Sequence, residues 1–443
     1  MTDDPLRTTR RGFVALAGSV SLAGCGGLNP LSEPEPTTID GSALREAASG
    51  DPPTVPPAVP IAVEQAYVDA GVETVRDTLA SVPAPFDERE VPNGMIRREL
   101  GEMHERATDA LEDVSEAPSP AEALGSLRYA RESATAVATA WRAIDGDVAF
   151  DDVRETASAV RGEIDDFRGR WRYVGDDPVR AVLAHGEVEG HVATAGRRLS
   201  GAVDRSRYVA ENPVVIGEMA GDVAAARASL THGAYLYDRF VASLSATRPM
   251  GPVFRAAGES LTATMNDRRE ELPAADGSPS SYVGGDAAEA PVGSALVELR
   301  DGIEYADRID DERATGQRAN VVLSAFWTLV RIRAFERLRE RVERGDYVTV
   351  ESAADVRRMR ESAFRAVESA LASDAPPRLA HHVLQTVGAL EYVAKRLHEY
   401  EDDDEVHVDW LGRELGRYVS VEAMARATPE TTKSVADAIR SAR

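Results

Sequence analysis

The sequence predicts an all-α protein, built as two tandem, duplicated helical bundles of about six helices each after a disordered, Pro-rich tether. Three observations support this fold class. From residue 61 onward, apolar residues recur at steps of three and four, the spacing of amphipathic helices. No run of four or more alternating apolar and polar residues indicates a strand. Several short motifs recur about 199 residues apart, which indicates an internal repeat.

Length and charge narrow the class of protein further. A chain of 443 residues with 43% hydrophobic residues can bury more than one core, so two or three domains are expected. The formal net charge is −24, which argues against nucleic acid as a partner because phosphate contacts need a basic face. Only Lys395 and Lys433 are lysines. This acidic, Lys-poor composition resembles that of proteins from extremely halophilic archaea, where salt screens the repulsion between carboxylates.

Residues 1–24 have the pattern of an export signal. Arg10 and Arg11 stand just before a short apolar run from Phe13 to Ala23, an order that resembles twin-arginine signal peptides. That run is shorter than the about 20 residues that span a bilayer. The run ends in Leu-Ala-Gly-Cys, which resembles a lipobox with Cys25 as the lipidated residue. Signal and composition together resemble haloarchaeal lipoproteins exported by the twin-arginine pathway, which implies a lipid anchor on the outer face of the cell membrane.

The lipidated cysteine and a Pro-rich tether are expected to occupy residues 25–60. Eight prolines fall within residues 26–60, with Ser, Thr, Gly and Glu between them, a composition that does not bury a core. Cys25 is the only cysteine. This excludes disulfides, a thiol nucleophile and Cys-ligated zinc from the exported part.

The first bundle is expected over residues 61–245. Two apolar stripes mark long helices, each with one buried face: Ile96, Leu100, Met103, Ala107, Ala110 and Val114, then Val153, Ala157, Val160, Ile164 and Phe167. Asp177-Pro178 and Asn212-Pro213 mark two helix starts, because proline is favoured at the first helical position.

The second bundle is expected over residues 250–443, as a repeat of the first. Its clearest stripe is Leu379, Val383, Val387, Leu390, Val393 and Leu397, and Thr428-Pro429 predicts another helix start. The repeated motifs include Gly146-Asp147 with Gly345-Asp346, and Asp152-Val153-Arg154 with Asp355-Val356-Arg357. Gly190 and Gly388 also correspond, and we expect each to lie at a close contact between helices, because glycine destabilises a helix interior.

The best local cluster of chemical groups is His185-Gly-Glu187-Val-Glu189-Gly-His191. On a helix, His185 shares a face with Glu189, and Glu187 shares a different face with His191. One interpretation is two solvated ion pairs. The other is a metal site formed by His185, Glu189, His191 and a ligand from another helix, His232.

No catalytic residue or cofactor site is expected elsewhere. The chain lacks a Gly-x-Ser-x-Gly elbow, a phosphate-binding loop, a dinucleotide-binding glycine motif and a His-Glu-x-x-His zinc motif. The sequence therefore favours a non-enzymatic, lipid-anchored interaction or scaffold module with a cell-surface protein partner. The alternative is a solute- or metal-binding lipoprotein with a pocket between the bundles, and a third hypothesis is a metal-dependent hydrolase.

Overall fold

The chain is all-α in the computed structural model, which describes residues 37–203, 211–304 and 308–442. The predicted signal residues Arg10 and Arg11 and the predicted lipidation site Cys25 lie outside these ranges. The first half of the described chain forms long helices: α2 (Gln65–Ala80), α3 (Gly94–Glu116), α4 (Ala123–Ile144), α5 (Phe150–Arg170), α6 (Pro178–Val203) and α7 (Pro213–Ala242). Pro178 and Pro213 begin helices, as predicted.

The second half follows the same order with some helices broken into shorter pieces. Its helices are α8 (Gly251–Glu270), α9 (Asp286–Glu289), α10 (Pro291–Glu304), α11 (Arg308–Ala314), α12 (Arg318–Glu343), α13 (Ala353–Leu371), α14 (Pro377–Leu384), α15 (Gly388–His398) and α16 (Gly412–Ser441). Two small antiparallel sheets complete the described chain: β1 (Thr38–Ile39) with β4 (Val406–His407), and β2 (Val174–Gly175) with β3 (Arg248–Pro249). No helix in the described ranges is both long and apolar enough to cross a membrane.

The turns and caps show the internal repeat. Gly146 after α4 and Gly345 after α12 have φ values of +77° and +75°, in the left-handed region that favours glycine. In both turns the next amide, of Asp147 or Asp346, donates to a carbonyl in the last turn of the helix, at 3.0 and 2.9 Å. The repeated turn motif therefore marks the same helix ending in both halves.

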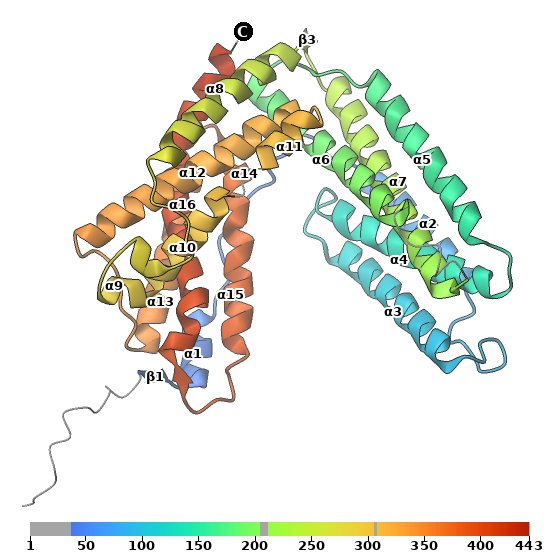
Figure 1. The fold of residues 1–443 in the computed structure, drawn as a ribbon, viewed down its shortest axis with the longest axis horizontal. Coiled ribbons are helices and arrows are strands. Elements are labelled where there is room, and N and C mark those ends of the chain that lie inside the picture. The colour runs from blue at the N-terminus through green and yellow to red at the C-terminus, as the bar shows by residue number, and fades with distance from the viewer. Residues whose placement is uncertain (1–36, 204–210, 305–307, 443) are drawn as a thin grey trace, which may run out of the picture. The chain divides into compact units, whose positions relative to one another are not determined.

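The helices after these turns also begin alike. The side chain of Asp152 accepts a hydrogen bond from the amide of Ala149 at 2.8 Å, and the side chain of Asp355 accepts one from Ser352 at 2.9 Å. In the first half α7 packs against α4, α5 and α6; in the second, α16 packs against α12, α13 and α15. Figure 1 shows α7 and α16, each of 30 residues, among these partners. The predicted stripes of α3 and α5 face the core, with all members buried except the half-buried Ile96.

The two halves share part of their core. Phe240 of α7, Phe254 of α8 and Phe326 of α12 belong to one continuous cluster of buried residues. Helix α6 contacts α12, α14 and α16, so it carries much of the contact between the halves. Gly186 of α6 lies so close to α12 that an added Cβ would collide with Leu323.

The predicted tether is wrong for residues 37–60. Strand β1 pairs with β4, and α1 (Gly41–Ala48) packs against α13 and α15, as Figure 1 shows. Leu44, Ala47 and Ala48 are fully buried in the core of the second half. The apolar face of this short helix packs against α13 and α15, more than 300 residues further along the chain. The burial of its apolar side chains holds the segment in place. At most residues 26–36 remain for a tether.

The helix start predicted at Thr428-Pro429 is also wrong, because Pro429 lies inside α16. Proline inside a helix removes one hydrogen bond and costs about 3 kcal/mol. Helix α16 continues through it because its flanks are packed. Thr428 is fully buried and its hydroxyl donates to the carbonyl of Met424 at 2.8 Å, while Thr431 and Thr432 are buried one turn further.

The close contacts expected at Gly190 and Gly388 are absent, since an added Cβ at either position would have no neighbour within 4 Å. Helix α7 instead makes its close approach at Gly217. A Cβ there would collide with the backbone carbonyl of Ala136 in α4 and lie close to the Cβ of Ala140.

Replacing Gly217 with alanine should therefore lower the free energy of unfolding by about 1–2 kcal/mol, because α7 would have to move away from the backbone of α4. The matched control is Gly101→Ala, on the exposed side of α3, where an added Cβ meets nothing. That control should raise stability by about 0.5–1 kcal/mol, because alanine favours a helix. Urea unfolding monitored by circular dichroism measures both. Equal effects at the two positions would show that the α4–α7 approach is not tight.

Candidate functional site

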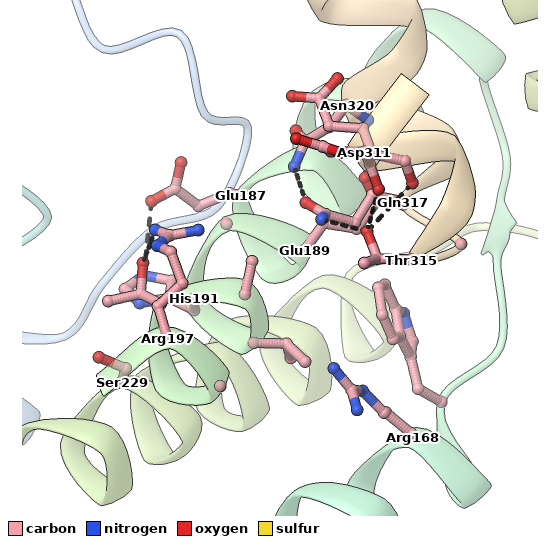
Figure 2. A pocket seen from close by; sticks show the side chains of 18 of the residues that line it. Arg168, Glu187, Glu189, His191, Arg197, Ser229, Asp311, Thr315, Gln317 and Asn320 are labelled. Atoms are coloured by element: carbon pink, nitrogen blue, oxygen red, sulfur yellow. Dashed lines mark hydrogen bonds and ion pairs between the residues drawn. The ribbon is translucent and has the colours of Figure 1, made fainter. Parts of the chain in front are cut away.

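A cavity of about 1040 Å³ lies between the two halves and is the candidate functional site. Helices α4, α5 and α6 contribute the wall from the first half, and α11 with the start of α12 contributes the wall from the second half. Its size is typical of a pocket for a small organic ligand. Figure 2 shows the polar side chains that surround it.

Glu189 of α6 joins the two walls. Its carboxylate accepts hydrogen bonds from the amides of Ala319 and Asn320 at 3.0 and 2.6 Å, and from the hydroxyl of Tyr173 at 2.6 Å. Ala319 and Asn320 lie in the first turn of α12, whose own N-cap residue, Gln317, makes no capping hydrogen bond. A carboxylate at this end also interacts favourably with the helix dipole. The first half therefore supplies the cap for a central helix of the second half.

The environment of Glu189 affects its protonation. Its side chain is almost completely buried, and this burial raises its pKa to about 7, while the three hydrogen bonds act in the opposite direction. Tyr173 also donates to the carbonyl of Gly316 at 2.9 Å, so the same hydroxyl holds the loop before α12.

His185 has a different set of partners. The indole N–H of Trp171 donates to its Nδ1 at 3.1 Å, so Nε2 carries the proton and donates to the carbonyl of Val174 at 2.9 Å. Burial lowers its pKa to about 4. His185 is thus a neutral core histidine that fixes the segment leading into β2.

The remaining cluster residues lie on another face of α6, as predicted. Glu187 and His191 form an ion pair with 3.4 Å between oxygen and Nε2. His191 also lies edge-on to His232, with ring centroids 5.8 Å apart. His232 is fully buried, and neither of its ring nitrogens has a hydrogen-bond partner among the described residues. Burial lowers its pKa to about 3, and the charges of His191, Arg131 and Arg128 act in the same direction.

These positions decide between the two interpretations of the cluster. Glu187 and His191 lie within ion-pair distance of each other, with the carboxylate partly exposed and the ring mostly buried. The solvated ion pair is wrong for His185 and Glu189, which are buried and have separate partners. The four metal candidates do not meet, because His185 bonds to Trp171, Glu189 caps α12, and only His191 and His232 are neighbours. In the described part of the chain, no group of three or more His, Cys, Asp or Glu side chains could hold a metal ion. The structure thus gives the predicted metal site and the metal-dependent hydrolase no support.

Both walls of the cavity carry charged groups of both signs. The wall from the first half carries Arg128, Arg168 and Arg197 beside Glu187 and Glu189, and the wall from the second half carries Asp311 and Glu312 beside Arg308. The four arginines and the two acids of the second wall were not identified from the sequence. In a chain with 75 acidic residues, two more acids before α12 carry no distinguishing signal. Only the position of α11 beside α6 makes them part of a site.

Two hydroxyl groups of the cavity bond to their own helices. Ser200 and Ser229 donate to carbonyls of their own helices, at 3.1 and 2.9 Å. A nucleophilic serine would instead bond to a general base. The arrangement can bind a polar ligand, because it combines a half-open cavity with charged and amide groups of both halves.

The comparisons with known proteins divide the chain at the same point as the fold. Residues 66–246 match a family described as Domain of unknown function (DUF8262), and residues 251–437 match another described as Domain of unknown function (DUF8264). No curated protein and no solved structure matches the chain. The boundary between the two matches falls at β3.

Proposed function

We propose that the protein is a lipid-anchored, non-catalytic binding module on the outer face of the cell membrane, and that it binds a small polar solute in the cavity between its halves. The single observation that carries the binding proposal is that cavity of about 1040 Å³, with walls from both halves. Glu189 supports it, because it connects the two walls and makes the shape of the cavity depend on the contact between the halves.

The short tether limits how far the second half can lie from the membrane. Cys25 and Thr37 are twelve residues apart, and a chain of that length reaches at most about 40 Å. Thr37 leads into β1 at the edge of the second half, next to β4. A lipid on Cys25 would therefore keep the second half within about 40 Å of the membrane surface, closer than the full tether of residues 25–60 would.

The anchor is tested by Cys25→Ser expressed in a haloarchaeal host. Serine cannot form the thioether to the lipid, so the variant should shift from the membrane fraction to the medium or the soluble fraction. The matched control is Ser32→Ala in the proposed tether, which should leave the protein on the membrane. A Cys25→Ser variant that stays in the membrane fraction after washing would contradict a lipid anchor at this residue.

Blocking the cavity tests the binding proposal. Gly190 lines the cavity and has open space at its Cβ position, so Gly190→Trp should fill the cavity without disturbing the helix packing. Gly101→Trp is the control in open space on α3. Both variants are screened by thermal unfolding against amino acids, sugars, carboxylates and amines in about 2 M KCl, which screens the surface carboxylates.

A ligand should raise the melting temperature of the wild-type protein and of Gly101→Trp, but not of Gly190→Trp, because a ligand stabilises the folded state to which it binds. A panel that stabilises none of the three proteins would count against a solute-binding function.

Binding of a partner protein remains a second candidate, and one observation favours it. The side chain of Trp410 is 63% exposed and lies against His407, with ring centroids 4.5 Å apart. Exposed tryptophans are enriched at protein interfaces. Crosslinking on native membranes with wild-type protein and Trp410→Ala tests it: a stoichiometric partner should be lost in the variant.

A further inference from the structure

We propose that the ligand of the cavity is a small zwitterion, with its anionic group held by the arginines of the first half and its cationic nitrogen by Glu312 and Asp311 of the second. This inference rests on the function proposed above, in which the cavity is the binding site. It is carried by the charged groups on each wall that lack a full set of partners: arginines on the first wall and carboxylates on the second.

The wall from the first half can accept a negative group. Arg197 contacts only the hydroxyl of Thr194, at 3.0 Å, and has no ion pair within the described chain. Arg168 has one exposed partner, Asp165, at 3.8 Å. Both guanidinium groups are thus available at the cavity, and a guanidinium binds a carboxylate through two parallel hydrogen bonds.

The wall from the second half can accept a positive group. Glu312 is only 4% exposed, and its Oε1 accepts hydrogen bonds from Arg308 and Ser324. Its Oε2 is buried and makes no hydrogen bond to any described residue. A buried carboxylate oxygen without a donor is costly, and an ammonium group with three donors would satisfy it. Asp311, next to it on α11, has a side chain without a described partner and adds a second negative charge.

The two sets of groups lie apart. In Figure 2 Arg197 stands near His191 on α6, Arg168 stands apart from it on α5, and Asp311 stands next to Asn320 at the start of α12. Glu187 is already paired with His191, Glu189 caps α12, and Arg308 is paired with Glu312 through Oε1. A ligand with only an anionic group would leave Asp311 and Oε2 of Glu312 without a partner, and a cationic ligand would leave Arg197 without one. A molecule with both groups at its ends pairs with both walls, in a cavity large enough to hold it.

The first experiment measures the binding of matched ligands by isothermal titration calorimetry on the full folded chain, in the same high-salt buffer. The zwitterions are glycine, γ-aminobutyrate and ε-aminohexanoate, which differ in the separation of their charges. Butyrate and butylamine each carry one of the two charges, and butanol carries none. At least one zwitterion should bind about tenfold or more tighter than butyrate and butylamine, because each charge pair contributes at least about 1.4 kcal/mol.

Two variants then assign the charges. In Arg197→Met the best zwitterion should bind no tighter than butylamine, and in Glu312→Gln no tighter than butyrate. Glutamine keeps an acceptor for Ser324 and Arg308, so the second variant removes the charge and, with it, the ion pair to Arg308. The controls are Arg161→Met on α5 and Glu259→Gln on α8, both exposed and outside the cavity. They should bind as the wild type does.

The possible results separate this inference from the function it rests on. If butyrate, butylamine or butanol binds as tightly as the zwitterions, and Gly190→Trp abolishes that binding, the cavity is a binding site and the zwitterion inference is wrong. It is also wrong if all three zwitterions fail while another solute of the wider panel binds. Failure of every solute in both experiments would contradict the proposed function itself.

Discussion

Replacing Glu189 with alanine is expected to lower the free energy of unfolding by about 3 kcal/mol. The substitution leaves the amides of Ala319 and Asn320 without their acceptor, at a position where the Glu189 side chain is almost completely buried. The hydroxyl of Tyr173 keeps the carbonyl of Gly316. Each buried donor without an acceptor costs about 1–3 kcal/mol, and part of that cost is recovered by local rearrangement. Because the cap connects the halves, the loss should appear as a change in their contact as well as in stability.

The measurement is urea unfolding in the high-salt buffer, followed by circular dichroism and by tryptophan fluorescence. Glu187→Ala is the matched control on the same helix. Its ion pair with His191 is partly exposed and should contribute less than about 1 kcal/mol. Limited proteolysis of Glu189→Ala should also cut before α12, near Gly316, sooner than in the wild type. If the two alanine variants lost the same small amount of stability, the cap would not be holding α12.

Acid is expected to destabilise the protein through its buried histidines. Burial lowers the pKa of His185 to about 4 and that of His232 to about 3, both below the usual 6.5 of an exposed histidine. The folded state therefore favours the neutral rings. Their contribution to stability is complete above pH 6.5 and declines as the pH falls toward the folded-state values. The slope is about 1.4 kcal/mol per pH unit for each ring, or about 2–3 kcal/mol between pH 6.5 and 4.5.

His232→Leu isolates this effect, because the ring of His232 has no hydrogen bond to lose. The variant should match or exceed the wild type in stability at pH 7, and should lose about 2–3 kcal/mol less on acidification to pH 4.5. His398→Leu, at the exposed end of α15, should follow the wild-type profile.

Glu189 contributes with the opposite sign. Its raised pKa means that its contribution is complete below the ordinary carboxyl value and is lost as the pH rises toward 7. The free energy of unfolding of His232→Leu is therefore compared with that of the wild type at each pH, so that the contribution of Glu189 cancels. A wild-type and a His232→Leu curve that run parallel from pH 7 to 4.5 would show that the buried ring does not drive the acid loss.

Much of the fold could be predicted from the sequence because many helices bury one face. In α3 and α5 the apolar stripe, the helix and the buried face coincide. The repeat could be found for a similar reason. Gly146 and Gly345 occupy turns in which the backbone itself demands glycine, and Asp152 and Asp355 occupy equivalent caps. Such constraints act within a few residues and leave their mark in the local sequence.

The predictions from the sequence are wrong where the contact that decides the structure comes from a distant part of the chain. The apolar residues of α1 are too few to predict an ordered segment, and they fold because α13 and α15 cover them. Pro429 normally ends a helix, and the packing of α16 overrides that preference. Gly190 was expected at a helix contact and instead faces the cavity. The sequence shows a glycine in either case, so it does not distinguish the two positions.

The candidate site shows the same division. The sequence placed His185, Glu187, Glu189 and His191 on one helix and sorted them into two faces, and both points are confirmed. It did not distinguish a buried carboxylate from the many exposed ones, because burial depends on residues that are distant in the chain. Glu312 bonds to Ser324, 12 positions away, and Glu189 bonds to Ala319, 130 positions away.

The sequence by itself thus determined the helical class, the division into two repeated halves and the caps and turns of individual helices, because these follow from backbone sterics and periodic burial. Only the tertiary structure decided that residues 37–48 belong to the second half, that the cap of α12 comes from the first half, and that two acids of α11 line the same cavity as three arginines of the first half. Those features depend on which helices pack against each other. Contacts between helices that are distant in the chain leave no local pattern in the sequence.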